Sequence, residues 1–234
     1  MPISKRIEVD GKRVYVIDGT NYDSVTSALS SISKPALIAW AAKQGSLANM
    51  KATQDAAMGI GSEAHEIIDH YLKATLTDVH LHEKKPEVLQ AFDNFKEWAT
   101  TKDFRIVDSE VLCYSPKHLY AGTLDALAYI DGKLCIADWK TSSGIWGEYW
   151  LQTEAYAAAL EEMHNLGLVA LPGPITHLAI LRLSKKDSTF EPRLQERRKR
   201  YFDVFISALD VYKWQCEDKK ESNAYYNKKI KRKR

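Results

Sequence analysis

Two aspartates and a lysine stand out in the segment GTLDALAYIDGKLCIADWK, residues 122–140, because their spacing would bring them together. The Asp131–Gly132 dipeptide is the strongest hairpin signal in the chain, and a two-residue turn there would pair residue 130 with residue 133. Five steps along the same ladder, Asp125 would face Asp138, with their Cβ atoms roughly 5 Å apart. Lys140 shares that face because strand side chains alternate with a period of two.

This trio could serve either of two purposes. Two carboxylates this close repel each other, and burying them is unfavourable unless a cation joins them. Lys140 could supply that cation in a purely structural ion pair. A hard divalent cation, which prefers oxygen ligands, is the alternative. Such an Asp–Asp–Lys group around Mg²⁺ suits phosphodiester hydrolysis, because the metal acidifies a bound water while the lysine orients that water and shields developing charge.

Four further residues could join this group. Glu110 lies in the preceding predicted strand, where its alternation could bring it to the same face. His65 lies in the helical segment GSEAHEIIDHYL, although a lone histidine there could equally be packed or solvated. Gln152 and Tyr156 are separated by one helical turn, so they project from one face of the helix after Lys140.

Aromatic residues also gather near the trio in the sequence. Trp146 and Tyr149 follow Lys140 in a loop and a helix start, where their faces could stack unpaired bases. Core packing is the more common use of Trp139 and Trp150. We therefore expect Trp146 and Tyr149 to be the better candidates for stacking on substrate bases.

The elements that must position these residues follow from hydrophobic periodicity and turn signals. In order, we expect a hairpin over 6–17, helices over 24–33, 35–45, 48–75 (interrupted at 59–61) and 86–100, strands over 104–114, 119–130 and 133–140, a helix over 147–163, a strand over 176–184 and a helix over 198–216. The loop 185–192 should be mobile, and the basic run 193–200 could begin the last helix or follow a phosphate backbone. We expect one domain over 1–227, with a hairpin and helical elaboration over 1–100 and a β-β-β-α-β-α core over 101–216.

Composition narrows the class of protein. The 234 residues are 45% hydrophobic and 27% charged, which is ordinary globular usage, and no stretch resembles a membrane span. Six of the last seven residues, 228–234, are basic, and without them acidic residues outnumber basic ones. This tail could capture a polyanion or could simply be solvated. The three scattered cysteines suit a reducing compartment, and no signal or transit peptide is apparent, so we expect a cytoplasmic protein.

These motifs together resemble a known family. GTLD (122–125) followed by DWK (138–140) resembles the signature of PD-(D/E)XK nucleases, and Gln152 with Tyr156 resembles the QxxxY motif of their RecB-like exonuclease branch. His65 and Glu110 match a helical histidine and a strand acid of that branch. The segment 24–45 and the Gly-x-x-x-His block that follows it are similar to the mitochondrial genome-maintenance exonuclease group and its phage and bacterial relatives. The resemblance covers roughly residues 20–185.

The resemblance implies an α/β PD-(D/E)XK (restriction-endonuclease-like) fold with a mixed central sheet flanked by helices. It also implies a metal site for Mg²⁺ or Mn²⁺. Its implied roles are metal binding by His65, Asp125, Asp138 and the Trp139 carbonyl, a further ligand or base role for Glu110, water positioning by Lys140, and organisation of a phosphate or of the lysine by Gln152 and Tyr156. Relatives with an iron–sulfur cluster use four cysteines, so we expect none here. Leu124 occupies the place of the proline in the family name.

The expected function is that of a metal-dependent DNA exonuclease acting on single strands or DNA ends in replication, recombination or repair. Replication or recombination proteins of a bacterium or phage-infected cell are possible partners, and the oligomeric state is left open. Two alternatives remain: a structure-selective endonuclease of the same fold, and a non-catalytic nucleic-acid-binding module whose acidic site is structural.

Overall fold

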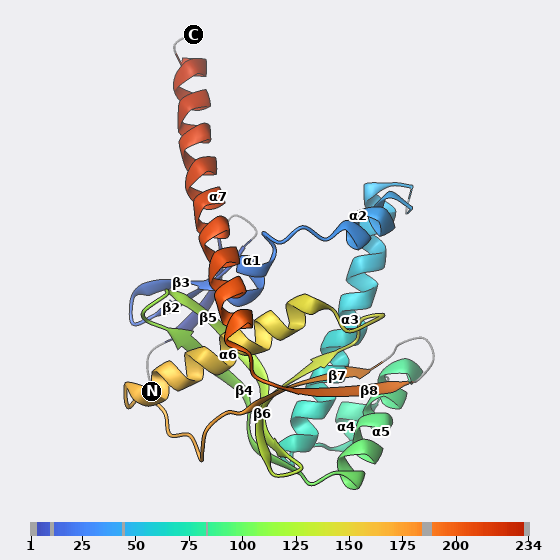
Figure 1. Ribbon diagram of the computed structural model, residues 1–234. Coiled ribbons are helices and arrows are strands. Elements are labelled where there is room, and N and C mark those ends of the chain that lie inside the picture. The colour runs from blue at the N-terminus through green and yellow to red at the C-terminus, as the bar shows by residue number, and fades with distance from the viewer. Residues whose placement is uncertain (1–3, 10–11, 44, 83, 184–188, 232–234) are drawn as a thin grey trace.

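The computed structural model describes residues 4–9, 12–43, 45–82, 84–183 and 189–231. Its elements in chain order are β1 (Ser4–Val9), β2 (Lys12–Ile17), β3 (Thr20–Ser24), α1 (Val25–Leu29), α2 (Pro35–Ala42), α3 (Leu47–Leu72), α4 (Asp78–Leu81), α5 (Pro86–Thr101), β4 (Phe104–Ser115), β5 (Tyr120–Ile130), β6 (Lys133–Lys140), α6 (Gly147–Asn165), β7 (His177–Leu183), β8 (Phe190–Glu196) and α7 (Lys199–Lys231). Figure 1 shows their arrangement.

All eight described strands belong to one mixed sheet. Its order is β1-β2-β3-β5-β6-β7-β8, and β4 pairs with the other side of β5. The pairs β3–β5 and β6–β7 are parallel, whereas the other described pairs are antiparallel. The structure confirms the predicted α/β class, a mixed central sheet flanked by helices.

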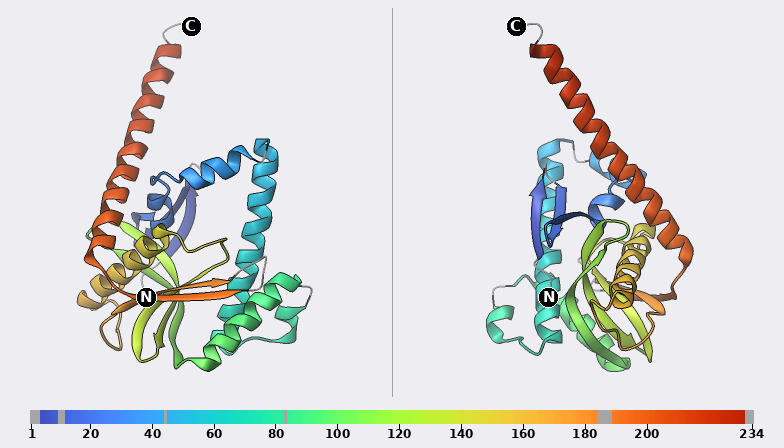
Figure 2. Two further views of the ribbon diagram at one scale, coloured as in Figure 1. Left: turned by 45° about the vertical axis from the view of Figure 1, so that its right-hand side comes forward. Right: turned by 90° about the vertical axis from the view of Figure 1, so that its left-hand side faces the viewer.

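Helices cover both faces of the sheet (Figure 2). On one face, α1, α6 and α7 pack over strand residues that include Leu127, Leu134 and Ile136. On the other face, α3 and α5 pack over Ala126, Cys135, Ala137 and their neighbours. Alternation along β5 and β6 thus divides the apolar side chains between two cores, as the period of a strand requires.

The hairpin between β5 and β6 has the predicted register. Ile130 pairs with Lys133 and the ladder continues to Ala126 opposite Ala137. Asp131 and Gly132 both have positive φ, at 49° and 75°, as an Asp-Gly turn of type I′ requires. The turn at residues 10–11 of the first predicted hairpin lies outside the described residues.

The predicted interruption at 59–61 is wrong, because α3 runs without a break from Leu47 to Leu72. Glycine in a helix costs only about 1 kcal/mol relative to alanine, and a long helix with other support tolerates that cost. The Ser46 hydroxyl caps the helix by accepting a hydrogen bond from the Asn49 amide at 3.1 Å. His65 is therefore carried on one continuous helix that starts far from the sheet.

The region after β7 also differs from expectation. Residues 190–196 form the edge strand β8, so part of the predicted loop and part of the basic run 193–200 lie in the sheet. The helix α7 then begins at Lys199 and extends to Lys231, beyond the predicted end at 216. The predicted tail 228–234 thus begins inside a helix. Its last three residues lie outside the described part of the chain.

The far half of α7 leaves the body of the protein (Figure 1). Phe205, Leu209 and Tyr212 are buried, whereas Trp214 is 62% exposed.

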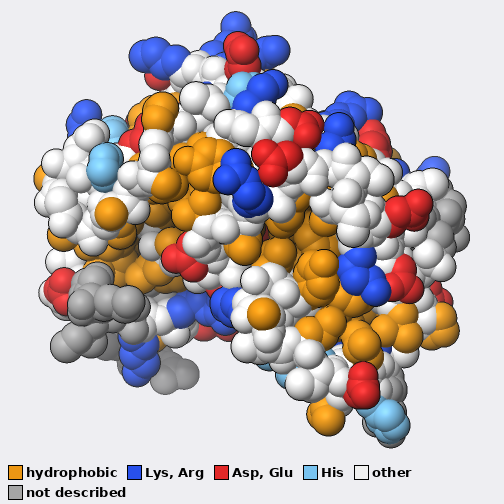
Figure 3. All heavy atoms as spheres, turned by 90° about the horizontal axis from the view of Figure 1, so that it is seen from below, with side chains coloured by type: hydrophobic (Ala, Val, Ile, Leu, Met, Phe, Trp, Pro, Cys, Tyr) orange, Lys and Arg blue, Asp and Glu red, His pale blue; other side chains and the backbone are white. Residues whose placement is uncertain are grey.

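Acidic and basic side chains are interspersed over the face seen in Figure 3, with apolar side chains between them. No helix within the described ranges is long and apolar enough to cross a bilayer.

Candidate active site

The site lies where the sheet divides beside β5. The strand β6 pairs with β5 only over residues 126–130, while β3 pairs with β5 only at Tyr120 and Ala121. Residues 122–125 therefore have no ladder partner on that side in the described registers. At the end of the β6 ladder, the Trp139 amide donates instead to Asp125 Oδ2 at 2.8 Å. Because the strands separate here, the backbone amide of Trp139 donates to the Asp125 side chain.

Asp138 and Lys140 form the centre of the site. The Lys140 Nζ atom lies 2.6 Å from Asp138 Oδ2, and the side chains are 17% and 2% exposed. Gln152 from α6 completes the group, because its Oε1 accepts from Lys140 at 3.2 Å and its Nε2 donates to Asp138 Oδ1 at 3.3 Å. The Gln152 Nε2 also donates to the Tyr156 hydroxyl at 3.0 Å. The QxxxY pair therefore holds both charged side chains.

His65 reaches the same site from α3. Its Nδ1 lies 3.6 Å from Asp125 Oδ2. Trp139 contributes only its backbone, because its indole packs on the opposite face of the sheet against Phe95, with ring centroids 5.0 Å apart. Alternation along β6 explains this division: Asp138 and Lys140 face α6, and the Trp139 side chain faces α5.

Glu110 occupies an unusual backbone position at the rim. Its neighbours Ser109 and Val111 pair with Ala126 and Leu124, so Glu110 lies opposite Asp125 in the ladder. Its φ of 53° falls in the left-handed region, which costs a residue other than glycine on the order of 1 kcal/mol or more. The preceding register shift at residues 106–108 also bends this strand. Such strain is often found next to functional groups.

The site contains more acidic side chains than lysine side chains, and the pKa values of these groups shift accordingly. Burial, followed by the neighbouring Asp138, raises the pKa of Asp125. Partial desolvation, followed by Asp125 and Asp69, raises the pKa of Glu110, although the residue as a whole is exposed. Burial alone would lower the pKa of Lys140, but Asp138 and Asp125 outweigh it and raise that pKa. Burial lowers the pKa of His65 and so favours its neutral form.

The two predicted stacking residues lie in different surroundings. Trp146 is 44% exposed just before α6. Tyr149 is half-buried, and its ring centroid lies 4.8 Å from Lys140 Nζ. Base stacking stays a prediction for both residues.

Two residues that sequence reasoning passed over also build the site. Asp69, one turn after His65, accepts a hydrogen bond from Ser109 Oγ at 2.7 Å and so joins α3 to β4 beside Glu110. Gly122 is needed because a Cβ atom there would overlap the Tyr156 ring. The i, i+4 relation of Asp69 to His65 and the presence of Gly122 in GTLD were the available signals.

The donor set can be compared with the needs of a metal ion. Within the described ranges, no three His, Cys, Asp or Glu side chains already have the spacing of a metal centre. The donors are nevertheless of types that Mn²⁺ can use: the carboxylates of Asp125 and Asp138, the His65 imidazole 3.6 Å from Asp125, and the backbone carbonyl of Trp139. The buried Asp138 Oδ2 accepts no hydrogen bond of normal geometry, although Lys140 is close. A metal ion would therefore have an acceptor available but would have to displace the lysine from it.

Comparisons with known proteins found a similarity to solved structures. No protein-family model matches the chain. No curated protein matches it either. Among solved structures, the alkaline exonuclease LHK-Exo from Laribacter hongkongensis is similar to the chain with a TM-score of 0.44, and the same protein in complex with dAMP with a TM-score of 0.46. Each shares 10% sequence identity and covers 89% of this chain and 94% of that one.

Proposed function

We propose that the protein is a divalent-metal-dependent nuclease that hydrolyses phosphodiester bonds in DNA, as an exonuclease on single strands or DNA ends. The observation that carries this proposal is the excess of negative charge at the split in the sheet. Asp138 is 1% exposed and the Asp125 side chain 14% exposed, and Lys140 pairs with Asp138 while interacting electrostatically with Asp125. Burial beside Asp138 raises the pKa of Asp125, so this pair of acids holds a proton more readily than exposed carboxyl groups do, and a divalent cation could take the place of that proton.

The charge excess favours a metal over a structural ion pair. A structural pair needs one carboxylate for one lysine, and the second carboxylate would then only add repulsion. Asp125, Asp138, His65 and the Trp139 carbonyl would hold the metal. When bound, Mg²⁺ or Mn²⁺ would acidify a water and neutralise charge on the scissile phosphate. Glu110 would act at the rim as a further ligand or base.

The remaining residues would prepare the attack on phosphorus. In hydrolysis, a water oxygen bonds to phosphorus and loses a proton as the bond to the leaving deoxyribose oxygen breaks, and that oxygen takes a proton from the solvent. The Lys140 ammonium would orient that water and hydrogen-bond to the phosphate oxygens, where negative charge grows. Gln152 would keep Lys140 and Asp138 aligned, and Tyr156 would anchor Gln152. The imidazole of His65 suits Mn²⁺ better than Mg²⁺, so we expect Mn²⁺ to support at least equal activity.

Two features support single-stranded DNA as the substrate. Trp146 is an exposed aromatic next to the site, and stacking contributes about 1–3 kcal/mol per base without regard to sequence. The chain also leaves the body after α1, crosses through α2 and returns along α3 to the site (Figures 1 and 2). Lys34, at the start of α2, pairs with Glu148 at the start of α6, with 3.1 Å between Nζ and Oε1. We propose that a single strand with a free end passes beneath this helical segment.

A time course on linear and covalently closed circular single-stranded DNA tests the proposal. With Mn²⁺ or Mg²⁺, the linear strand should be degraded while the circle resists, and EDTA should stop the reaction. Asp125→Asn should be inactive, whereas the matched control Asp131→Asn, in the exposed hairpin turn, should retain activity. Equal rates on both substrates would favour the endonuclease. Binding of DNA without metal-dependent cleavage of any substrate would favour the non-catalytic module.

A further inference from the structure

The ring of Tyr149 lies against the ammonium group of Lys140. The ring centroid is 4.8 Å from Nζ, within the range of a cation–π interaction. The Ser142 side chain, which follows Lys140 by two residues, interacts with the Tyr149 hydroxyl. The Ser142 hydroxyl in turn donates to the Gly144 carbonyl at 2.7 Å. The ring is thus held at one end by the loop that leaves β6.

Lys140 needs such support because its side chain is long and flexible. Four rotatable bonds separate the ammonium from the backbone, and the nearest charge, Asp138, draws it toward the carboxylate at 2.6 Å. Gln152 and Tyr149 are three residues apart on α6, so they approach the lysine from the same helix face. Asp138, Gln152 and Tyr149 together surround the ammonium.

We propose that Tyr149 is a positioning residue for Lys140, acting through its ring face. The inference rests on the proposed function, in which Lys140 orients the attacking water. A metal that binds Asp138 would remove the main anchor of the lysine. Gln152 and the Tyr149 ring would then keep the ammonium at the site. The alternative use of the same ring is to stack a DNA base.

Rates at saturating DNA measure the positioning role. Tyr149→Leu should lower the single-turnover cleavage rate with Mn²⁺ about 10-fold, which corresponds to about 1.4 kcal/mol and lies within the range of a partly desolvated cation–π contact. Tyr149→Phe keeps the ring and should restore most of the rate. The matched control is Tyr129→Leu, which removes a ring that lies 5.1 Å from the Arg105 guanidinium, in the part of β5 next to the turn. This control should cleave at the wild-type rate.

Two comparisons separate positioning from stacking. In a Lys140→Ala background, adding Tyr149→Leu should cause no further loss if the ring acts through the lysine. The affinity for single-stranded DNA without metal should also stay within twofold of wild type. An additive loss of rate, or a DNA affinity lowered as in Trp146→Leu, would overturn the positioning role and assign the ring to a base.

A readout without DNA keeps the inference distinct from the proposed function. In the NMR spectrum, the Lys140 ε-methylene protons, assigned by their loss in Lys140→Ala, should be shifted upfield by the ring. That shift should remain in Tyr149→Phe and disappear in Tyr149→Leu. If the wild type fails to cleave DNA, the proposed function falls. An unshifted Lys140 signal would overturn the contact itself.

Discussion

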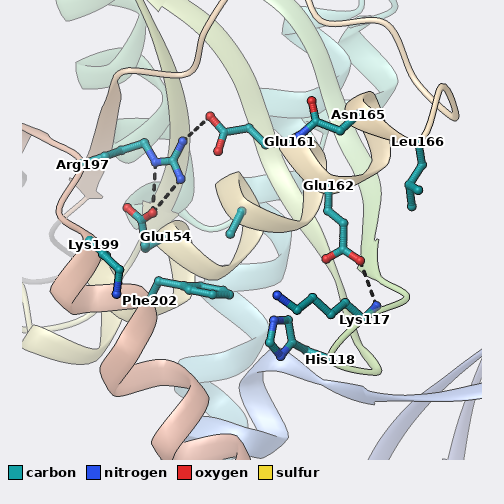
Figure 4. A pocket seen from close by; sticks show the side chains of 11 residues that line it. Lys117, His118, Glu154, Glu161, Glu162, Asn165, Leu166, Arg197, Lys199 and Phe202 are labelled. Carbon is teal, nitrogen blue, oxygen red and sulfur yellow. Dashed lines mark hydrogen bonds and ion pairs between the residues drawn. The ribbon is translucent and has the colours of Figure 1, made fainter.

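Two ionic clusters lie on opposite faces of α6, and they differ in the kind of cation and in the exposure of the second acid. At the site, Lys140 is the lysine beside Asp138 and Asp125, and both of these acids are largely buried. On the outward face, Arg197 pairs with Glu154 and Glu161, and the Glu161 side chain is 37% exposed (Figure 4). The excess acid of the outward cluster is therefore solvated, whereas the excess acid of the site is not.

The outward cluster shows what a structural ion pair looks like in this protein. Arg197 donates from Nε and Nη2 to Glu154 Oε1, at 3.0 and 2.7 Å, and from Nη1 to Glu161 and to the Ile175 carbonyl. A planar guanidinium with fixed donors suits a structural ion pair of this kind, whereas a lysine ammonium is a point charge on a flexible side chain. Glu154 Oε2 also lacks a hydrogen bond in the described network, so one unbonded oxygen does not by itself identify a catalytic site.

A hollow of about 710 Å³ lies beside the outward cluster and is lined by Lys117, His118, Phe202 and their neighbours (Figure 4). It is separate from Asp138 and Lys140.

The largest expected effect concerns the stability of the outward cluster. Arg197→Met leaves Glu154 buried without its cation and should lower the free energy of unfolding by about 3 kcal/mol. Urea denaturation measures this change. The matched control is Arg193→Met, which removes an exposed partner of Glu191 and should cost less than about 1 kcal/mol. Equal losses would show that the outward cluster is not a structural joint.

The site should respond to charge changes in its rate rather than in its folding. Asp125→Asn, Asp138→Asn and Lys140→Ala should each lower DNA cleavage at least ~100-fold, because each removes stabilisation of charge at the phosphate. Lys133→Ala, an exposed change on the same strand, should cleave normally. Circular dichroism would confirm folding. A near wild-type rate for any of the three site variants would remove that residue from the mechanism.

Much of this site could be predicted because its signals are local. The Asp-Gly turn sets the register of β5 and β6, and Asp125 and Asp138 lie one residue beyond the last ladder pair, Ala126 with Ala137. The edge strand β8 was missed because its sequence FEPRLQE alternates weakly and contains a proline, which is tolerated at an edge. The left-handed Glu110 has no sequence signal, since its conformation depends on the strand that it faces.

The place of Tyr149 could not be predicted for a similar reason. An aromatic residue at a helix start can face solvent, core or a charged neighbour, and only the angle between α6 and β6 decides among them. The length of α7 was underestimated because its second half lacks the apolar periodicity of a packed helix.

A smaller effect is expected from a change at Gly122, the β5 residue against which Tyr156 of α6 packs. In Gly122→Ala, the new methyl group would overlap Tyr156 and so shift the anchor of Gln152. We expect a loss of about 1–3 kcal/mol in stability and about 10-fold in cleavage rate. Gly173→Ala is the matched control, because its methyl would meet only Tyr129 at an ordinary 3.8 Å. Stability and rate measured together should show no change in that control.

The smallest effect should come from the end of α7. Deleting residues 228–234 removes six basic groups, so the affinity for DNA should fall less steeply with rising salt. The cleavage rate at saturating DNA should not change, since this end of the helix projects from the body (Figure 1). Fluorescence anisotropy at several salt concentrations measures the slope. The same slope with and without these residues would exclude them from DNA capture.

Calorimetric titration with Mn²⁺ tests most directly whether Asp125, Asp138 and their neighbours bind a metal ion. The wild type should bind Mn²⁺ with measurable heat, and Asp138→Asn should lose that heat while remaining folded. Glu161→Gln, which removes an acid from the outward cluster, should bind as the wild type does. Equal binding by the wild type and Asp138→Asn, or no binding by either, would contradict the account.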